Sequence, residues 1–349
     1  MNINFAETAE VMMSELESDP DFLPSEYWRD INKKNVTMLE AEGIENFKRT
    51  VSQNYYSWLI TSVRHPMFRH LFFRWLCRPS LRPFRSRIEK KIKLCLITGE
   101  QPIILSGWER FIYRIFVGLV WEAMLAEDHE KLHTELSEPE IGNPIHIWQG
   151  DKLITQDLAN SIVECNVIAA LVKKAPDRPK IAEVGAGSGR LAHVYAQTQK
   201  GRYFIFDIPP ALNVAEWYLS HVLLNKTIFY FRKFDDFESV REEIEKSDVA
   251  FFSVNQIKKF PSGYFDVMLS ISTFPEMKLE QVKLYIDIFQ TLSAGYIYIK
   301  QWKSWKNPID GTDLGIDDYL NNKDWSLKID REDPINPLFF NRVWQRTAS

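Results

Sequence analysis

Apolar residues follow two different patterns in the two parts of the chain. Up to about residue 135 they recur at helical spacing, and Ser106 precedes a long apolar-periodic run in the manner of a helix N-cap. From about residue 160, short apolar runs alternate with helical stretches such as residues 279–292. Strands that alternate with helices predict a parallel sheet covered by helices on both faces.

The apolar runs also place the individual strands. Six are predicted at residues 180–184, 203–206, 227–231, 249–254, 266–271 and 296–300. The last two runs, 325–329 and 339–344, leave no room for a helix between them and predict an antiparallel hairpin. The predicted fold class is α/β, with a mostly parallel Rossmann-like sheet that ends in this hairpin. We place a helical N-terminal domain at residues 1–135 and the Rossmann-like domain at 136–349.

The composition is that of an ordinary globular protein. Hydrophobic residues make up 45% and charged residues 26%, and the net charge of −4 argues against a general nucleic-acid binder. Three cysteines are too few for a disulfide framework or a cysteine-rich metal site. The N-terminus is acidic, and no uncharged apolar run approaches the roughly 18 residues of a membrane span. These features predict a cytoplasmic protein.

The strongest local signal is a glycine loop after the first predicted strand. Gly185, Gly187 and Gly189 form G-x-G-x-G, whereas the dinucleotide fingerprint would need a glycine in place of Arg190. Asp207 ends the second strand, where an acid accepts both hydroxyls of a ribose. No Walker lysine accompanies the loop. The combination predicts a nucleoside ligand without phosphates, and S-adenosylmethionine is the common cellular compound of that description.

Other polar residues beside these strands are candidates for holding the same ligand. Asn255 and Gln256 follow the strand at 249–254, where either side chain is placed to bond an adenine edge, although a surface turn is an equally good interpretation. Gln156 and Asn160 share one face of the helix before the first strand and are predicted to approach the methionine end of the ligand or the acceptor; the alternative is a helix start capped by Thr155. The remaining candidates are Glu183, Ile208 and Ser270.

The chain resembles the bacterial sugar O-methyltransferases, a family of class I S-adenosylmethionine-dependent methyltransferases. The resemblance covers the chain from about residue 24 onward. Besides the glycine loop, which all class I enzymes share, it rests on P-S-E-Y-W at 24–28, N-F-K-R-T at 46–50, I-G-N-P at 141–144, F-P-E-M at 274–277 and Y-I-K-Q-W at 298–302. It implies a class I methyltransferase sheet, S-adenosylmethionine as donor and a sugar hydroxyl as acceptor in polysaccharide or glycosylated natural-product biosynthesis.

The resemblance leaves several questions open. The sugar, and whether it is free, nucleotide-linked, lipid-linked or polymeric, stays undetermined, as does the oligomeric state. The alternatives are transfer to a non-sugar small molecule, a non-catalytic scaffold that binds S-adenosylmethionine, and an oxidoreductase with a nucleotide cofactor.

Two residues are candidates for a general base. A sugar hydroxyl is a poor nucleophile, so a base within hydrogen-bond reach is expected beyond the carboxyl ends of the strands. Glu276 follows the strand at 266–271 and is the first choice; the alternative is an acid that stabilises the start of the next helix. His146 is the second choice, provided that residues 137–160 fold over the site. Trp302 and Trp305 are predicted to form an apolar platform for a sugar face.

The N-terminal part of the chain contains a potential zinc motif and a strongly basic segment. His129 to His133 match H-E-x-x-H, but a zinc site needs a third ligand and only His146 lies nearby, so no metal site is predicted. Residues 64–93 hold ten Lys and Arg interleaved with aromatic residues. This segment is either a solvated helix face or a patch for anionic lipid or phosphates, which would give peripheral membrane contact.

Overall fold

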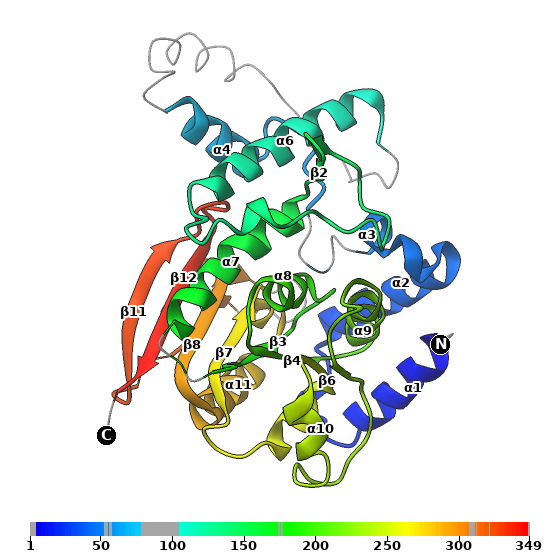
Figure 1. Cartoon of the computed structure of the whole chain (residues 1–349), viewed down its shortest axis with the longest axis vertical. Coiled ribbons are helices and arrows are strands. Elements are labelled where there is room, and N and C mark those ends of the chain that lie inside the picture. Colours follow the sequence, from blue (N-terminus) through cyan, green and yellow to red (C-terminus); the bar gives the residue numbers. More distant parts are fainter. Residues whose placement is uncertain are drawn as a thin grey trace.

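The centre of the molecule is an eight-stranded sheet in the order β11-β12-β8-β7-β3-β4-β6-β5 (Figure 1). The computed structural model describes residues 5–51, 55, 58–77, 105–173, 175, 177–306, 311, 313–320 and 322–347. The strands of the sheet are β3 (Lys180–Val184), β4 (Arg202–Asp207), β5 (Ile228–Phe229), β6 (Val249–Ser253), β7 (Phe265–Ile271), β8 (Ser293–Trp302), β11 (Trp325–Glu332) and β12 (Phe339–Arg346).

The pairing of these strands confirms the predicted fold class. The strands from β5 to β8 pair in parallel, and β12 pairs antiparallel with β8 and with β11. The last strand of the chain is therefore inserted between β8 and β11, and β11 and β12 form the predicted terminal antiparallel hairpin. The short strand β5 extends the opposite edge.

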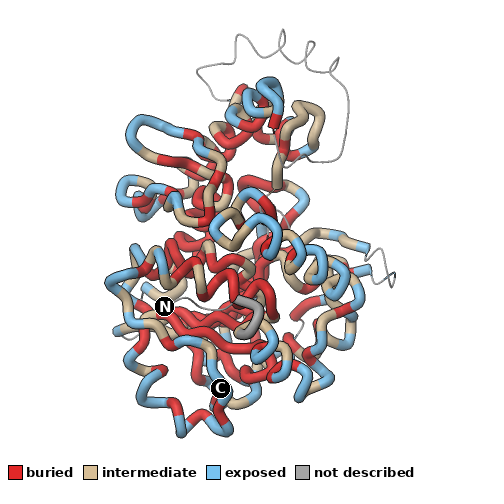
Figure 2. The backbone as a smooth tube through the Cα atoms, turned by 90° about the vertical axis from the view of Figure 1, so that its right-hand side faces the viewer, coloured by how far each residue is buried: buried red, intermediate tan, exposed pale blue. Residues whose placement is uncertain are grey.

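Helices cover both faces of the sheet. One face carries α7 (Gln156–Val172), α8 (Arg190–Thr198) and α9 (Ala211–Val222), and the other carries α10 (Arg241–Lys246) and α11 (Leu279–Leu292). Side chains alternate across a strand, so Ile205 packs on the first face while Phe204 and Phe206 pack on the second. Buried backbone runs through the middle of the molecule and the exposed segments lie at its periphery (Figure 2). Both faces of the parallel strands are dry, which explains their continuous apolar runs.

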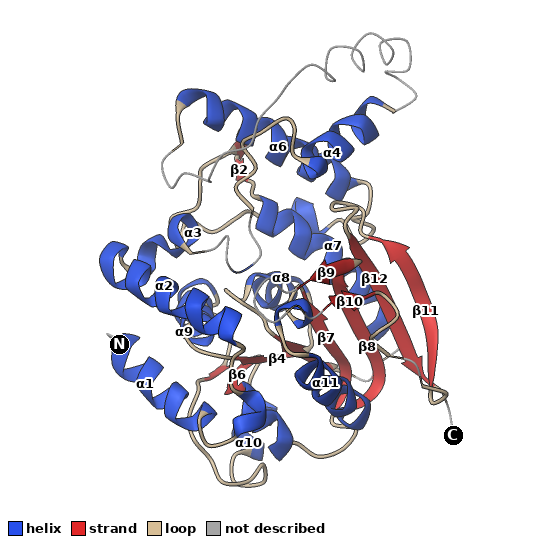
Figure 3. Cartoon of the chain, turned by 180° about the vertical axis from the view of Figure 1, so that it is seen from behind, coloured by secondary structure: helices blue, strands red, loops and turns tan. Residues whose placement is uncertain are grey.

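The N-terminal helices take two different positions. Helices α1 (Phe5–Leu16) and α2 (Glu26–Glu42) lie on the side of the sheet that holds β6 and α9 (Figure 3). Helix α6 (Gly107–Leu125) packs on α7, and α4 (Pro66–Leu76) packs on α6. The shorter elements are η1 (Pro20–Phe22), η2 (Ile44–Asn46), α3 (Phe47–Thr50), η5 (Leu132–Thr134), β1 (Trp148–Gln149), β2 (Lys152–Leu153), η6 (Val254–Lys259), η7 (Phe274–Glu276), β9 (Ser304–Lys306) and β10 (Asp313–Gly315).

Both helix caps considered in the sequence analysis are present. Ser106 caps α6 in a capping box with Glu109, and Thr155 caps α7 through the backbone N–H of Leu158 at 3.0 Å. The H-E-x-x-H segment does not form one continuous α-helix, because Lys131 has a left-handed backbone (φ 58°) and the 3-10 helix η5 begins only after it. Within the described ranges no helix is both long and apolar enough to cross a bilayer. Residues 78–93 of the basic segment lie outside the described residues.

Candidate functional site

The carboxyl ends of five strands meet at one cavity. Residues that end or follow β3, β4, β6, β7 and β8 line it, together with residues from η1, α2 and the segment before α4. The chain passes from β3 to β4 on one side of the sheet and later to β7 on the other, so the cavity lies at the switch point where doubly wound folds bind ligands. Its free volume of about 220 Å³ far exceeds the roughly 10–15 Å³ that one water needs. It is large enough for an organic ligand.

The glycine loop forms the floor of this cavity. Gly185 and Gly187 line it, and both have positive φ (79° and 59°). A Cβ on Gly185 would lie 2.2 Å from Thr273 Oγ1, and a Cβ on Gly187 would lie 3.2 Å from the carbonyl oxygen of Tyr55. Glycine is required at both positions because the backbone is left-handed and its neighbours leave no room for a side chain.

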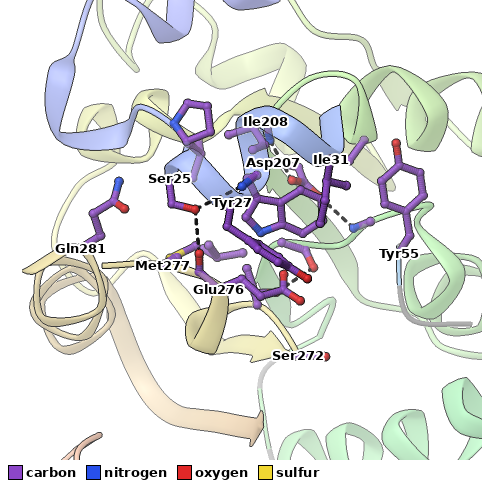
Figure 4. A pocket seen from close by; sticks show the side chains of 18 of the residues that line it. Ser25, Tyr27, Ile31, Tyr55, Asp207, Ile208, Ser272, Glu276, Met277 and Gln281 are labelled. Carbon is purple, nitrogen blue, oxygen red and sulfur yellow. Dashed lines mark hydrogen bonds between the residues drawn. The ribbon is translucent and has the colours of Figure 1, made fainter. Parts of the chain in front are cut away.

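Asp207 stands beside the loop at the end of β4. Its Oδ2 accepts the N–H of Gly187 at 2.8 Å, and its Oδ1 accepts its neighbour's N–H, that of Ile208, at 2.7 Å (Figure 4). Burial raises the pKa of Asp207 to about 7, although these backbone N–H groups act in the opposite direction. A carboxylate has about four acceptor sites, so Asp207 keeps acceptor capacity for a hydroxyl of a ligand beside the backbone N–H groups of Gly187, Ile208 and Ala186.

The N-terminal segment closes one side of the cavity. The Ser25 hydroxyl donates to the carbonyl of Glu276 at 2.7 Å, and the Asn32 amide donates to the carbonyl of Pro209 at 3.1 Å. Helix α2 thus bridges the segments that follow β7 and β4. The lining residues from η1, α2 and the link between them were not anticipated from sequence: Phe22, Leu23, Pro24, Ser25, Tyr27, Trp28, Ile31 and Asn32. The Phe22 and Trp28 rings had no pattern that separates a cavity wall from a core helix.

Glu276 lies in the cavity wall next to Tyr27 (Figure 4). Its Oε2 is buried without a hydrogen-bond partner in the described part of the chain. Burial raises the pKa of Glu276 to about 8, and a hydrogen bond from Trp28 lowers it in part. The Tyr27 pKa is raised too, by burial and then by the charge of Glu276. Ser272, just before this segment, has a left-handed backbone (φ 56°), a strained conformation that often marks functional sites.

Tryptophans form another wall of the cavity. Trp302, Trp305 and Trp58 line it, and their rings form a tilted stack, with 5.4 Å between Trp302 and Trp305 and 5.9 Å between Trp58 and Trp302. Phe339 supports Trp302 from behind at 4.6 Å. The indole N–H of Trp305 is buried and has no hydrogen-bond partner among the described residues. The predicted aromatic pair therefore lies in the cavity wall.

The predicted site residues fall into two groups. Gly185, Gly187, Asp207, Ile208 and Glu276 line one cavity. The others lie outside its lining: Glu183, Gly189, Gln256, Ser270, Gln156, Asn160 and His146.

The second group has structural partners in most cases. The carboxylate of Glu183 accepts the Tyr203 hydroxyl at 2.7 Å, and burial raises its pKa to about 8. Gln256 bonds the backbone of Ser253 and of Arg232.

The rest of the second group is placed as follows. Asn160 donates to the Gln156 carbonyl at 2.9 Å, while the Gln156 amide is fully buried without a partner among the described residues. The Ser270 hydroxyl lies 3.3 Å from the amide of Gln301. His146 is exposed and faces Trp148. Gly189 packs against Leu219.

A buried ion network fixes the elements that carry the site. Arg190, directly after the glycine loop, bonds Glu164 of α7 at 2.6 Å. Glu164 also accepts from Lys300 of β8 at 2.9 Å, and Lys300 reaches Asp333 at 2.8 Å. Glu164, Lys300 and Asp333 are fully buried side chains. The network ties the loop to β8, immediately before the tryptophan wall.

Gly185→Ala is expected to damage the cavity floor. The new methyl group meets Thr273 and the left-handed backbone is strained, so we expect a loss of stability of about 1–3 kcal/mol, measured by urea unfolding, together with weaker ligand binding. Gly263→Ala is the matched control, because Gly263 also has positive φ (66°) but nothing lies within 4 Å of the added atom. Equal losses of stability in both variants would show that the contact between the new methyl group and Thr273 adds nothing to the cost of the left-handed backbone.

Comparison with known proteins gives distant likenesses only. No family model and no curated protein matches the chain. Magnesium protoporphyrin IX methyltransferase (ChlM) from Synechocystis PCC 6803, solved with bound SAM, is 12% identical over 54% of this chain and 84% of its own, with a TM-score of 0.35. A SAM-dependent methyltransferase from Aquifex aeolicus is 15% identical over 51% and 88%, with a TM-score of 0.31. The pyocyanin biosynthetic protein PhzM is 13% identical over 68% and 72%, with a TM-score of 0.35. These TM-scores are too low to assign a function to this chain. The function proposed for it therefore rests on the residues of the cavity.

Proposed function

We propose that the protein is an S-adenosylmethionine-dependent O-methyltransferase that acts on a sugar hydroxyl. The observation that carries the proposal is one cavity in which a side-chain-free glycine floor, a buried carboxylate and an aromatic wall meet at the carboxyl edge of the sheet. The donor is placed at the first two features and the acceptor at the third. The N-terminal helices are assigned the role of shaping the site.

The residues of the cavity fit the donor. A bare backbone at Gly185 and Gly187 admits a ligand chain, and Asp207 is placed to accept both ribose hydroxyls. Ile208 and Val254 follow adjacent strands and offer apolar surfaces for an adenine ring. Within the described lining, no Lys or Arg is present to bind a phosphate, which favours a nucleoside over a dinucleotide.

The chemistry assigned to the chain is positioning and proton removal. The donor supplies a methyl group bound to a positively charged sulfur. Glu276 takes the proton of the acceptor hydroxyl as its oxygen becomes the nucleophile. The raised pKa of Glu276, about 8, makes its carboxylate a stronger base than an exposed glutamate. Holding the oxygen in line contributes up to roughly 7–11 kcal/mol.

The tryptophan wall supports a sugar as acceptor. The apolar face of a pyranose packs on aromatic rings, and the free N–H of Trp305 is a donor for one of its oxygens. Trp305→Ala is expected to raise the acceptor KM about tenfold, which corresponds to 1.4 kcal/mol, while the affinity for S-adenosylhomocysteine stays the same. The assay follows methyl transfer to neutral glycosides by mass spectrometry.

Trp108→Ala is the matched control for this experiment. Trp108 is 68% exposed on α6 and lies outside the cavity lining, so its loss is expected to leave the acceptor KM unchanged. An unaltered KM in Trp305→Ala, or methylation of planar aromatic acceptors but of no glycoside, would contradict the assignment to a sugar.

A further inference from the structure

The charge of the cavity wall limits what the cavity accepts. Among the residues that the structure describes, the lining contains two acids, Asp207 and Glu276, and no Lys, Arg or His. The undescribed stretches next to lining residues, 52–54, 56–57 and 307–310, also have no Lys, Arg or His in their sequence. The described part of the wall therefore offers no cation to a ligand.

The cations closest in sequence to the lining residues are committed elsewhere or exposed. Lys300 precedes the tryptophan wall but is fully buried between Glu164 and Asp333. Lys303 follows Trp302 and pairs with Glu332. Arg29, Lys33, Lys278 and Lys306 each directly follow a lining residue, but all four are exposed and outside the lining. None of these cationic side chains lines the cavity.

An anionic group on the acceptor ring would lose its hydration beside the tryptophan wall with no cation from the described lining to replace it. A carboxylate or phosphate that leaves water is stabilised only by a cation or by several donors. The wall formed by Trp58, Trp302 and Trp305 is largely apolar, and the carboxyl groups of Asp207 and Glu276, once ionised, repel an anion. A neutral sugar ring carries neither cost.

We propose that the acceptor unit inside the cavity carries no anionic substituent: it is a neutral sugar ring, and uronic acids and sugar phosphates are excluded. This inference rests on the proposed function, because it takes a sugar as the acceptor. It concerns the ring that receives the methyl group.

The test compares matched acceptors that differ in one charged group. Binding is measured by calorimetry with the full chain saturated with S-adenosylhomocysteine, using 4-nitrophenyl glucosides, galactosides and rhamnosides, the glucuronide and galacturonide counterparts, and glucose 6-phosphate. We expect the neutral member of the best-bound pair to bind at least about tenfold more tightly than its uronate, because the anion has no partner cation.

A substitution in the wall provides the second arm. Met277 lines the cavity next to Glu276 (Figure 4), so Met277→Lys adds a cation and is expected to narrow the gap between glucoside and glucuronide by at least about tenfold. Glu280→Lys is the control, since it adds the same side chain at an exposed position on α11. If Met277→Lys does not fold, Glu276→Gln removes one acid and is expected to narrow the gap at pH 9.

Each outcome decides a different point. The inference is supported if the protein binds the glucoside more tightly than the glucuronide, if Met277→Lys narrows this gap in affinity, and if Glu280→Lys leaves it unchanged. Equal or tighter binding of the uronates or of glucose 6-phosphate overturns the charge selectivity but leaves a sugar acceptor standing. Binding of no glycoside of either charge overturns the proposed sugar function itself.

Discussion

Glu276→Gln is expected to lower methyl transfer by about 10²–10⁴-fold, the usual contribution of a general base. Glutamine has nearly the same shape as glutamate but cannot accept the hydroxyl proton. Because Glu276 lines the cavity and is proposed to contact the acceptor hydroxyl rather than the donor, the change is expected in kcat, with S-adenosylhomocysteine affinity unchanged. The measurement is steady-state turnover on the best neutral glycoside.

The pH profile separates this role from a structural one. Glu276 acts as its carboxylate and its pKa is raised to about 8, so kcat/KM is expected to rise with pH and level off above about 8. Glu276→Gln should remove this limb. The control is Glu280→Gln, which changes an exposed acid four positions later on α11 and should leave both rate and profile intact. Full activity of Glu276→Gln would assign proton removal to another group.

Asp207→Ala is expected to abolish measurable binding of S-adenosylhomocysteine, a loss of at least about 100-fold. Two ligand hydroxyls would lose a charged acceptor, and hydrogen bonds to charged groups each contribute about 1.5–3 kcal/mol. The Gly187 N–H would also lose the acceptor that holds it at 2.8 Å. Asp207→Asn keeps the shape and isolates the charge, and the measurement for both variants is isothermal calorimetry.

The same carboxyl predicts a pH dependence of donor binding. Asp207 accepts the ribose hydroxyls as a carboxylate, and its pKa in the free cavity is raised to about 7. Affinity is therefore expected to fall as the pH is lowered through 7, by at most about tenfold per pH unit, and to be constant well above it. Asp207→Asn should lose this dependence, while Asp235→Asn, at an exposed acid after β5, should retain it. A flat wild-type profile would contradict the assigned role of Asp207.

The sequence predicted the site best at positions where a single physical requirement dictates the residue type. Glycines at positive φ and an acid at the end of a strand mark a loop and its partner without knowledge of the tertiary structure, and both line the cavity. The alternation of strands and helices and the terminal hairpin likewise predicted the sheet. These features depend on short-range geometry.

Polar and aromatic side chains that occur both in ligand sites and in protein cores could not be assigned from the sequence. Glu183 and Gln256 precede or follow the right strands, but their polar atoms are taken up by Tyr203 and by backbone groups in the core. Trp28 and Phe22 carry no local signal of a cavity wall, and only the folding of η1 and α2 across the sheet edge places them in the cavity. Contacts between residues hundreds of positions apart, such as Ser25 with Glu276, have no local sequence signal.

A nucleoside-type methyl donor is expected to occupy the cavity beside Gly185, Gly187 and Asp207. The decisive experiment is calorimetric titration of the unmodified chain with S-adenosylhomocysteine and, separately, with NADH. We expect saturable binding of S-adenosylhomocysteine and no binding of NADH. Binding of NADH alone, or of neither ligand, would rule out a nucleoside-type methyl donor in this cavity.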